Sequence, residues 1–333
     1  IHAALSHLIV RTVYSPSEWA THRVMKENSA ACELYSGTPD WTPGINALYQ
    51  MPDRLYGIKD KLERHLCQRT DNLFNIDNRI VLFDLTNFYF EGRKAGSRKA
   101  RFGRSKEKRN DCRLLVLALC INREGFIRYS SILAGNTSDP KSLPGMIDKL
   151  AVKTSVTSKK TLVVIDAGIS TEENLQGIKE KGYNYLCVSR TRLKDYSLSK
   201  DHRTVTVHDT RKQEITLREV QTRPEEDYYL EITSPSKAMT EASMNRQWKE
   251  RFEGEMEKIN EAITRKGGTK RYEKVVERVG RAIERYPSIA RHYQITYLFN
   301  ERKPAEMQKV NWTIKDITAI DKNTGVYFLR TNV

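Results

Sequence analysis

Two aspartates that follow short apolar runs are the first candidates for chemistry in this sequence. The run 80–83 leads into Asp84, and the run 162–165 leads into Asp166. In open α/β sheets ligands gather beyond the carboxyl ends of strands, so parallel neighbouring strands would bring both carboxylates to one edge. Either aspartate alone is better explained as the start of a turn. The matched pair, however, suits Mg²⁺, a hard cation that takes carboxylates together with substrate phosphates.

A cationic segment follows Asp84 closely. Residues 91–113 hold ten Lys and Arg against three acids, and Gly92, Gly96 and Gly103 keep the segment loop-like. A charge run is usually a solvated loop. Its place near the expected metal edge favours contacts with DNA phosphates, which give affinity without reading sequence. The candidate DNA-binding residues are Arg93, Lys94, Arg98, Lys99, Arg101, Arg104, Lys106, Lys108 and Arg109, and Arg113 closes the segment.

The composition of the whole chain agrees with a polyanionic partner. The 333 residues carry 57 Lys and Arg against 42 Asp and Glu, a formal charge of +15 at pH 7. This excess favours nucleic acid as a partner. Hydrophobic residues make up 38%, and no run is long and apolar enough to predict a membrane span.

Several other classes of protein are excluded by missing patterns. Five scattered cysteines without a C-x-x-C pair predict neither a disulfide framework nor a zinc knuckle, and they fit a reducing cytosol. The phosphate-binding loop, dinucleotide fingerprint, zinc-protease pair and serine-nucleophile elbow are also missing. The chain begins with Ile1 and has no signal-peptide pattern, which indicates a fragment rather than a secreted precursor.

The elements that must position the candidates follow from the apolar pattern. Short apolar runs alternate with helical spacing in the order three strands, helix, strand, helix, strand, which predicts a mixed α/β sheet. The expected strands are 80–83, 114–121, 126–133, 162–165 and 185–188, with a hairpin turn at 122–125, a helix through 143–150 and a capping box from Ser170 to Glu173.

Both flanking regions have their own pattern. The first is helical, with a capping Ser15 before Pro16, and a second helix after Pro52 with an apolar stripe through Leu62 and Leu66. The later region has strand-like stretches, then two amphipathic helices joined at Gly267-Gly268, then strands 314–320 and 326–329 around a turn at 321–325. The predicted organisation is an N-terminal helical region at 1–75, a core at 76–190, an inserted strand-plus-helical-hairpin domain at 191–310 and a return to the core at 311–333.

Three motifs give the chain a family resemblance. These are D-L-T-N-F-Y-F-E at residues 84–91, G-N-T-S-D at 135–139 and V-I-D-A-G-I-S at 164–170. They resemble the DDE transposases of bacterial insertion sequences, in the IS-four-like group. Segments 8–18 and 326–332 look similar to the same group, so the resemblance extends over nearly the whole chain.

The resemblance implies an RNase H-like catalytic fold that binds Mg²⁺ or Mn²⁺ and cuts and joins insertion-sequence DNA. Asp84 and Asp166 match the family's first two catalytic, metal-binding aspartates, and Asn136 and Asp139 are expected to support them. The expected partner is double-stranded DNA, both transposon ends and target, with a homodimer on paired ends and no membrane. The implied location is the bacterial cytoplasm, at the nucleoid.

One departure from the family pattern concerns the third carboxylate, a helical Glu within Y-x-x-R-x-x-x-E. Tyr327 and Arg330 match its first two positions, but they lie in strand-like sequence and the Glu would be residue 334. We therefore expect the third ligand beyond Val333 and an inactive chain by itself. The alternatives are a non-enzymatic DNA-binding remnant or regulator derived from a transposase, and a generic RNase H-like nuclease.

Overall fold

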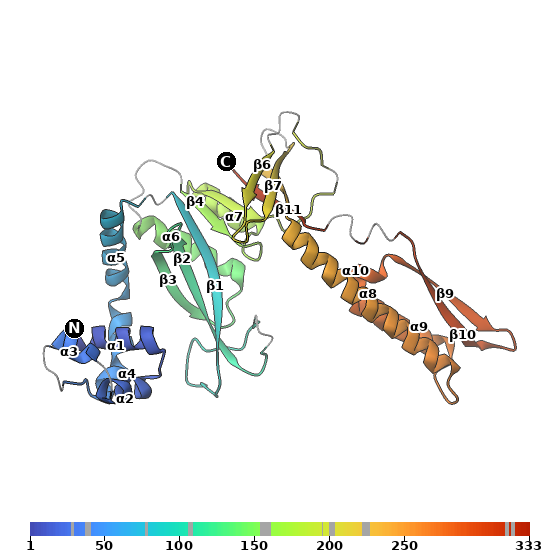
Figure 1. The fold of residues 1–333 in the computed structure, drawn as a ribbon, viewed down its shortest axis with the longest axis horizontal. Helices are drawn as coiled ribbons and strands as arrows, with labels where there is room; N and C mark the ends of the chain where they lie inside the picture. Colours follow the sequence, from blue (N-terminus) through green and yellow to red (C-terminus); the bar gives the residue numbers. More distant parts are fainter. Residues whose placement is uncertain are drawn as a thin grey trace. The chain divides into compact units, whose positions relative to one another are not determined.

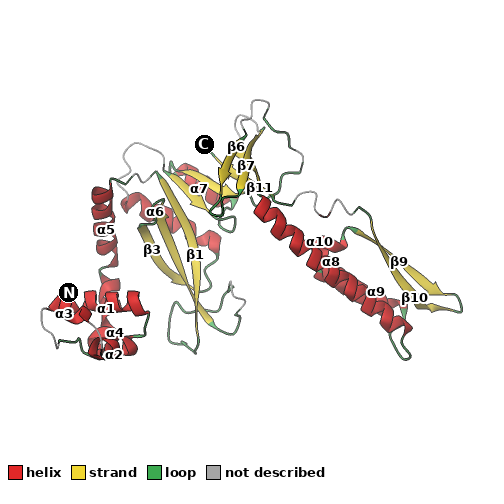
Figure 2. Cartoon of the chain, viewed as in Figure 1, coloured by secondary structure: helices red, strands yellow, loops and turns green. Residues whose placement is uncertain are grey.

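The computed structural model divides into two compact units, Ile1–Thr161 and Leu162–Val333, which are described separately. Their helices and strands are shown in Figures 1 and 2. No helix of the described residues is long and apolar enough to cross a membrane. The structure describes the chain except residues 28–29, 37–40, 77–78, 106–108, 154–160, 195, 200–203, 222–226, 317–319 and 321–323.

The first unit opens with five helices, which confirms the expected helical region. They are α1 (His2–Tyr14), α2 (Glu18–Glu27), α3 (Ala30–Ser36), α4 (Ile45–Gly57) and α5 (Lys59–Phe74). Val10, Met25, Cys32 and Leu48 form a small buried core shared by the first four of them. A small core of this kind is sufficient to hold short helices together because each contributes one apolar stripe.

The predicted cap at Ser15 is wrong by two residues. Helix α1 continues to Tyr14, and Ser15 ends it in the left-handed conformation with φ of 48°. Helix α2 then begins at Glu18, and the hydroxyl of Ser17 accepts a hydrogen bond from the amide of Ala20 at 3.3 Å. Ser17 is therefore the capping residue, because the preceding serine is used to end α1.

The predicted apolar stripe on α5 is also wrong. Leu62 and Leu66 are 38% and 51% exposed, whereas Cys67 is buried. The helix instead presents Asp71 to the buried guanidinium of Arg128 on the sheet, with a nitrogen-to-oxygen distance of 2.7 Å. A buried charge needs a charged partner, and this requirement sets the orientation of α5.

Three antiparallel strands form the sheet of the first unit, in the order β3-β2-β1. They are β1 (Ile80–Phe90), β2 (Arg113–Asn122) and β3 (Ile127–Ala134), and Gly125 with φ of 89° turns the chain between β2 and β3 as predicted. Helix α6 (Asp139–Lys153) follows and buries Leu143, Met146 and Ile147, which confirms the predicted helix.

The second unit contains a six-stranded sheet in the order β4-β5-β11-β8-β7-β6. Strands β4 and β5 are parallel, and the other neighbours are antiparallel. The strands are β4 (Leu162–Ile165), β5 (Asn184–Val188), β6 (Val205–His208), β7 (Glu214–Val220), β8 (Tyr228–Thr233) and β11 (Val326–Thr331). Strands β6 to β8 thus extend the sheet. The predicted domain ranges follow changes in the hydrophobic pattern of the sequence and stay a prediction.

Helix α7 (Glu172–Glu180) connects the parallel strands. Its cap is Thr171 rather than Ser170, because the Thr171 side chain accepts a hydrogen bond from the amide of Asn174. The hydroxyl of Ser170 is used within the preceding turn, where it donates to the carbonyl of Ala167.

A helical pair and a strand hairpin follow β8. The elements are α8 (Pro235–Thr264), α9 (Tyr272–Arg285), α10 (Pro287–Ala290), β9 (Tyr293–Asn300) and β10 (Lys303–Ile314). The helical pair is as predicted. The predicted strand 314–320 is wrong at 315, 316 and 320, since β10 ends at Ile314, and residues 317–319 lie outside the described residues. The strand lies earlier because Met307 and Val310 are buried in the core beneath α8 and α9. The predicted turn at 321–325 lies mostly outside the described residues.

Candidate functional site

Asp84 lies in the middle of β1 and not at its end, which corrects the prediction. The strand continues to Phe90 and pairs with β2 from Val81 onward. Residues after Asp84 are largely β-branched and aromatic, and such residues favour continuation of a strand. Phe83 and Leu85 are buried and Asp84 is exposed, so the pleat holds its carboxylate on the open face.

Asp166 does follow a strand, as predicted. It comes directly after β4, and its backbone carbonyl accepts hydrogen bonds from the amides of Ile169 at 3.0 Å and Ser170 at 3.3 Å. The guanidinium of Arg190 donates to the carbonyls of Ala167 and Gly168 and thereby fixes this turn. The sequence pattern did not indicate Arg190, because nothing local links it to residues 166–168.

The carboxylates of Asp84 and Asp166 are available to bind a metal. Both aspartates are exposed, and neither carboxylate forms an ion pair with any described residue. The Asp166 carboxylate has one long contact, 3.5 Å from the amide of Gly168. Carboxylates without a cationic partner fit a hard divalent cation by their donor chemistry. Among the described residues, no group of three His, Cys, Asp or Glu is arranged to hold a metal.

The residues that match the third-carboxylate motif are engaged elsewhere. Arg330 lies in β11, as the strand-like sequence predicted, and its guanidinium pairs with Glu172 and Asp227. Hydrogen bonding from Arg330 lowers the pKa of Glu172. Burial alone would raise the pKa of Asp227, but hydrogen bonds from Lys179 and Arg330 outweigh it and lower that pKa. This cluster therefore ties α7 to the sheet.

We expect Asp227→Asn to destabilise the second unit by about 3 kcal/mol at pH 7, because it removes a buried carboxylate that pairs with Lys179 and that shares Arg330 with Glu172. Since the folded pKa lies below the unfolded one, this stabilisation is present at neutral pH and is lost as the pH falls below about 4. Urea unfolding at pH 7 and pH 3 measures the difference. Glu277→Gln, at the exposed pair with Arg281, is the control and should change little. A wild-type advantage that grew toward pH 3 would contradict the assignment.

The cationic segment is partly a strap and not a free loop. Residues 97–103, the strap, are hydrogen-bonded across the sheet: Arg101 and Leu114 exchange two backbone bonds, and the amide of Gly135 donates to the carbonyl of Lys99 at 3.0 Å. A Cβ on Gly135 would lie 2.0 Å from the carbonyl oxygen of Leu114, and one on Gly103 would lie 2.1 Å from that of Gly135. The backbones approach so closely that only glycine fits at either position.

Gly135→Ala should therefore release the strap and destabilise the first unit by about 1–3 kcal/mol. Urea unfolding measures the loss, and trypsin cleavage after Arg98 or Arg101 should become faster. Gly96→Ala is the matched control, since a Cβ there meets nothing within 4 Å. Equal effects of the two substitutions would show that the close approach at Gly135 has no structural role.

The cations of this segment fall into two groups. Lys99, Arg109 and Arg113 are committed to structure: Lys99 donates to the carbonyl of Ile132, Arg109 pairs with Asp111, and Arg113 donates to the carbonyl of Ala100. Lys94 lies 5.8 Å from the ring centroid of Phe90. The second group is exposed, and its side chains have no partner among the described residues; it consists of Arg93, Arg98, Arg101 and Arg104, the free arginines. Lys106 and Lys108 lie outside the described residues.

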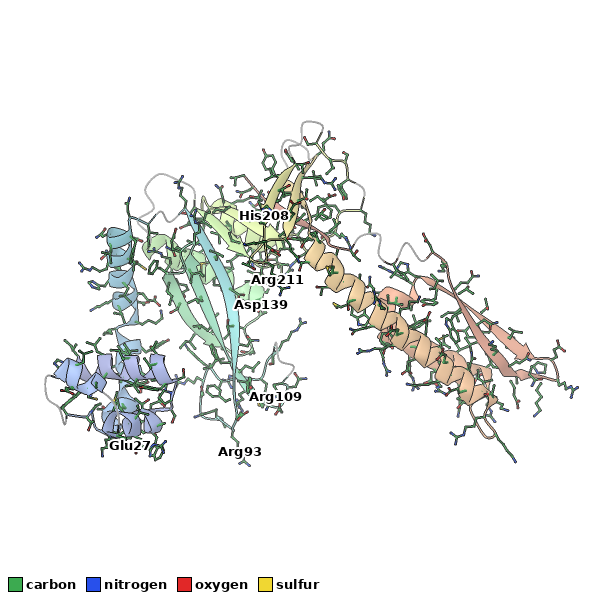
Figure 3. The ribbon with its side chains drawn as sticks, viewed as in Figure 1. Glu27, Arg93, Arg109, Asp139, His208 and Arg211 are labelled. Carbon is green, nitrogen blue, oxygen red and sulfur yellow. The ribbon has the colours of Figure 1, made fainter. Side chains whose placement is uncertain are left out.

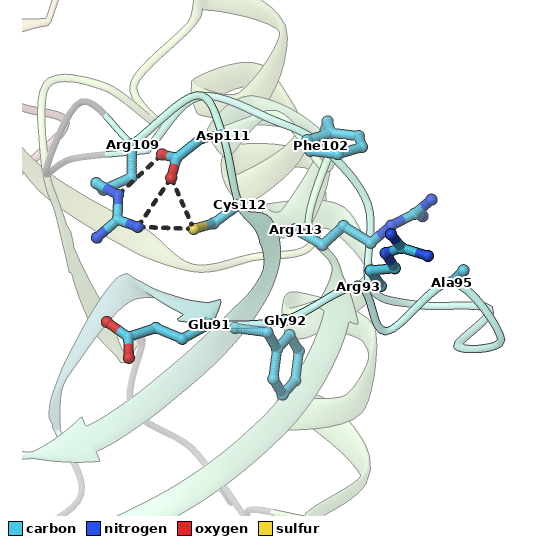
Figure 4. A pocket seen from close by; sticks show the side chains of 10 residues that line it. Glu91, Gly92, Arg93, Ala95, Phe102, Arg109, Asp111, Cys112 and Arg113 are labelled. Carbon is cyan, nitrogen blue, oxygen red and sulfur yellow. Dashed lines mark hydrogen bonds and ion pairs between the residues drawn. The ribbon is translucent and has the colours of Figure 1, made fainter.

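A pocket of about 490 Å³ opens beside the β1 end of this segment. Arg93, Arg109 and Arg113 line it together with Phe90 and Phe102 (Figure 4). The pair between Arg109 and Asp111 lowers the pKa of Asp111, so that its carboxylate stays charged and keeps Arg109 in place. Arg93 and Arg109 are labelled beside this end of β1 in Figure 3. The pocket thus combines cations with aromatic walls.

The predicted supporting residues lie at the start of α6. Asn136 and Asp139 are both exposed, and Asp139 is the first residue of the helix. The hydroxyl of Ser142 donates to the carbonyl of Asp139 at 2.6 Å. A supporting role for the two side chains stays a prediction. Within the motif G-N-T-S-D, Gly135 has a clear structural role, because it allows the close approach of the neighbouring backbones.

The family model described as a transposase DDE domain matches residues 75–312, and this range includes both aspartates and the cationic segment. No curated protein matches the sequence.

Among solved structures, the chain resembles a piggyBac transposase synaptic complex with hairpin DNA at 12% identity, over 68% of this chain and 50% of that one, with a TM-score of 0.33. It also resembles a Mos1 transposase paired-end complex with left transposon end at 12% identity, over 54% and 75%, with a TM-score of 0.24. A Mos1 mariner paired-end complex with Mn gives 12% identity, 55% and 72% coverage and a TM-score of 0.23. The chain spans half the length of the piggyBac chain.

Proposed function

We propose that this chain, which belongs to the family of transposase DDE domains, supplies two of the metal ligands with which a transposase cuts and joins insertion-sequence DNA. The observation that carries the proposal is the pair of exposed carboxylates, Asp84 and Asp166, within the matched range and without ion-pair partners among the described residues. Carboxylates kept free of cations in so basic a chain suit a divalent metal.

Asp84 and Asp166 would together hold Mg²⁺ or Mn²⁺. A bound divalent metal supplies Lewis-acid chemistry, which stabilises charge on the phosphoryl oxygens and favours formation of the attacking oxygen nucleophile. The chain contributes ligand position: the ladder with β2 holds Asp84, and the turn fixed by Arg190 holds Asp166. Restricting the carboxylates before the metal binds reduces the entropy lost on binding.

DNA is the proposed partner, as transposon ends and as target, with a homodimer on paired ends in the bacterial cytoplasm. The free arginines support phosphate contacts, because a guanidinium without a protein partner is available for bidentate phosphate binding. The strap supports them further by limiting the movement of the backbone that carries them.

The third carboxylate is proposed to come from outside the segment containing Tyr327 and Arg330. That segment is a strand, and Arg330 is paired with Glu172 and Asp227. A non-enzymatic DNA-binding role is the second candidate, favoured by the lack of a three-ligand group among the described residues.

The experiment that separates these two candidates is a titration of the 333-residue chain with Mn²⁺, followed by electron paramagnetic resonance. The transposase proposal expects binding that needs both Asp84 and Asp166. The non-enzymatic alternative expects no binding that depends on either residue.

A further inference from the structure

The far end of the α8–α9 pair carries a surface that the proposed metal site does not use. There the turn between the helices meets the hairpin of β9 and β10 (Figures 1 and 2), and these elements share a buried core that includes Val275, Met307 and Val310. The side chain of Asn260 on α8 donates to the carbonyl of Val310 and accepts from its amide, both at 2.8 Å. Helices and strands therefore form one rigid support for this end.

The turn itself is held closely. Gly267 has φ of 75°, and a Cβ on Gly268 would lie 1.9 Å from the carbonyl oxygen of Ala262. The amide of Met307 donates to the carbonyl of Lys270 at 2.7 Å, which joins the turn to β10. The side chains on this turn consequently extend from a well-defined backbone.

Cations without partners gather on this turn. Residues 265–274 contain five Lys and Arg and one acid, Glu273. By contrast, two of the three arginines further along α9, Arg281 and Arg285, pair with Glu277 and Glu255. No ion pair to a described residue is found for the five, which are Arg265, Lys266, Lys270, Arg271 and Lys274. Uncompensated charge in one place raises the local potential and attracts an anion.

Exposed aromatic rings lie next to these cations. Tyr272 and Phe299 are 40% and 45% exposed, and their ring centroids are 5.3 Å apart. The ring of Tyr297 lies 6.1 Å from that of Tyr272 in an edge-to-face arrangement. A pocket of about 450 Å³ lies beside the turn, and Arg265 and Lys266 are among the residues that line it. The surface thus offers rings for flat apolar groups and cations for anionic ones.

We propose that this surface, the hairpin-end platform, binds single-stranded DNA. Phosphates pair with the cations of residues 265–274, and unpaired bases stack on Tyr272 and Phe299. A duplex fits less well, because its bases are already stacked and expose only their edges. An acidic protein would satisfy the charge but leaves the exposed rings without a function. The platform lies wholly within the second unit and is independent of the metal proposal.

The test measures the affinity of the chain for a fluorescent oligodeoxythymidine and for a duplex of equal length, at fixed salt. The full 333-residue chain is used with alanine in place of the four free arginines, so that the cationic segment does not mask the platform. Tyr272→Leu with Phe299→Leu should weaken single-strand binding by at least about five-fold and duplex binding by less than about two-fold. Leucine keeps the apolar contacts, so the fold is preserved.

Matched controls separate stacking from general effects. Tyr14→Leu with Tyr49→Leu removes two comparably exposed rings from the first unit and should leave single-strand binding unchanged. Unchanged binding in the Tyr272 and Phe299 variant, or an equal loss for strand and duplex, would overturn the proposal. A strand containing 5-bromodeoxyuridine should photo-crosslink to peptides with Tyr272 or Phe299. Crosslinks confined to the first unit would overturn it as well.

Discussion

Asp84→Asn is expected to lower Mn²⁺ affinity by at least about 100-fold, because it removes a charged oxygen ligand, and even the loss of a residue that only hydrogen-bonds to a ligand costs about 10- to 100-fold. Asp166→Asn should have the same effect, since each carboxylate is half of the proposed ligand pair. Asparagine has the shape of aspartate, and Asp84 is exposed on β1, so the strand should remain intact. The paramagnetic resonance signal of free Mn²⁺ measures binding directly.

The control for this prediction is Asp53→Asn, which removes an exposed carboxylate from α4. Its Mn²⁺ affinity should equal that of the wild type. If Asp84→Asn and Asp166→Asn also bind Mn²⁺ with wild-type affinity, the aspartates are not metal ligands. That result would favour the non-enzymatic DNA-binding role. Loss of Mn²⁺ affinity in only one of the two variants would mean that the two carboxylates do not share a metal.

Alanine at all four free arginines is expected to reduce affinity for duplex DNA of unrelated sequence by roughly 10²- to 10³-fold at about 0.1 M salt. Each phosphate contact contributes about 0.9 to the slope of log affinity against log salt, so the slope should become shallower by up to about 3.6. Gel shift or fluorescence anisotropy over a series of salt concentrations provides both quantities. The committed cations are left in place, so the strap keeps its structure.

A second quadruple variant controls for net charge. Lys26, Lys61, Arg64 and Arg69 are exposed on α2 and α5, and their replacement removes the same four charges from the same unit. In this variant the slope of log affinity against log salt should stay close to that of the wild type. If both variants lose equal affinity, the effect comes from total charge, and the cationic segment is not a distinct DNA-binding surface.

Much of the element order could be predicted because it depends on local pattern. The apolar runs at 114–121 and 162–165 lie in strands. The residues with helical spacing at 143–150 lie in α6, and those within 244–286 lie in α8 and α9. The motifs at 84–91 and 164–170 predicted the family, which the model match over residues 75–312 confirms. Turns at Gly125 and Gly267 were predictable because a positive φ favours glycine.

Other features depend on contacts between distant residues. The place of Asp84 within β1 follows from pairing with β2, and the orientation of α5 follows from the buried Arg128. The β9–β10 hairpin was missed although Tyr293, Ile295 and Tyr297 alternate with more exposed residues along β9; its inner face packs against the core formed with α8 and α9.

The sequence by itself determined the family, the basic character of the chain and the residue types for metal and phosphate chemistry, because these depend on identity and spacing alone. Only the tertiary structure decided which cations are free. Arg109 and Lys99 look the same as Arg93 and Arg98 in the sequence, yet Asp111 and the carbonyl of Ile132 engage the first two. The same holds for residues 265–274, whose importance depends on the exposed rings of Tyr272 and Phe299. A side chain's availability depends on what the fold places beside it, and such a neighbour can be distant in sequence, as the carbonyl of Ile132 is for Lys99.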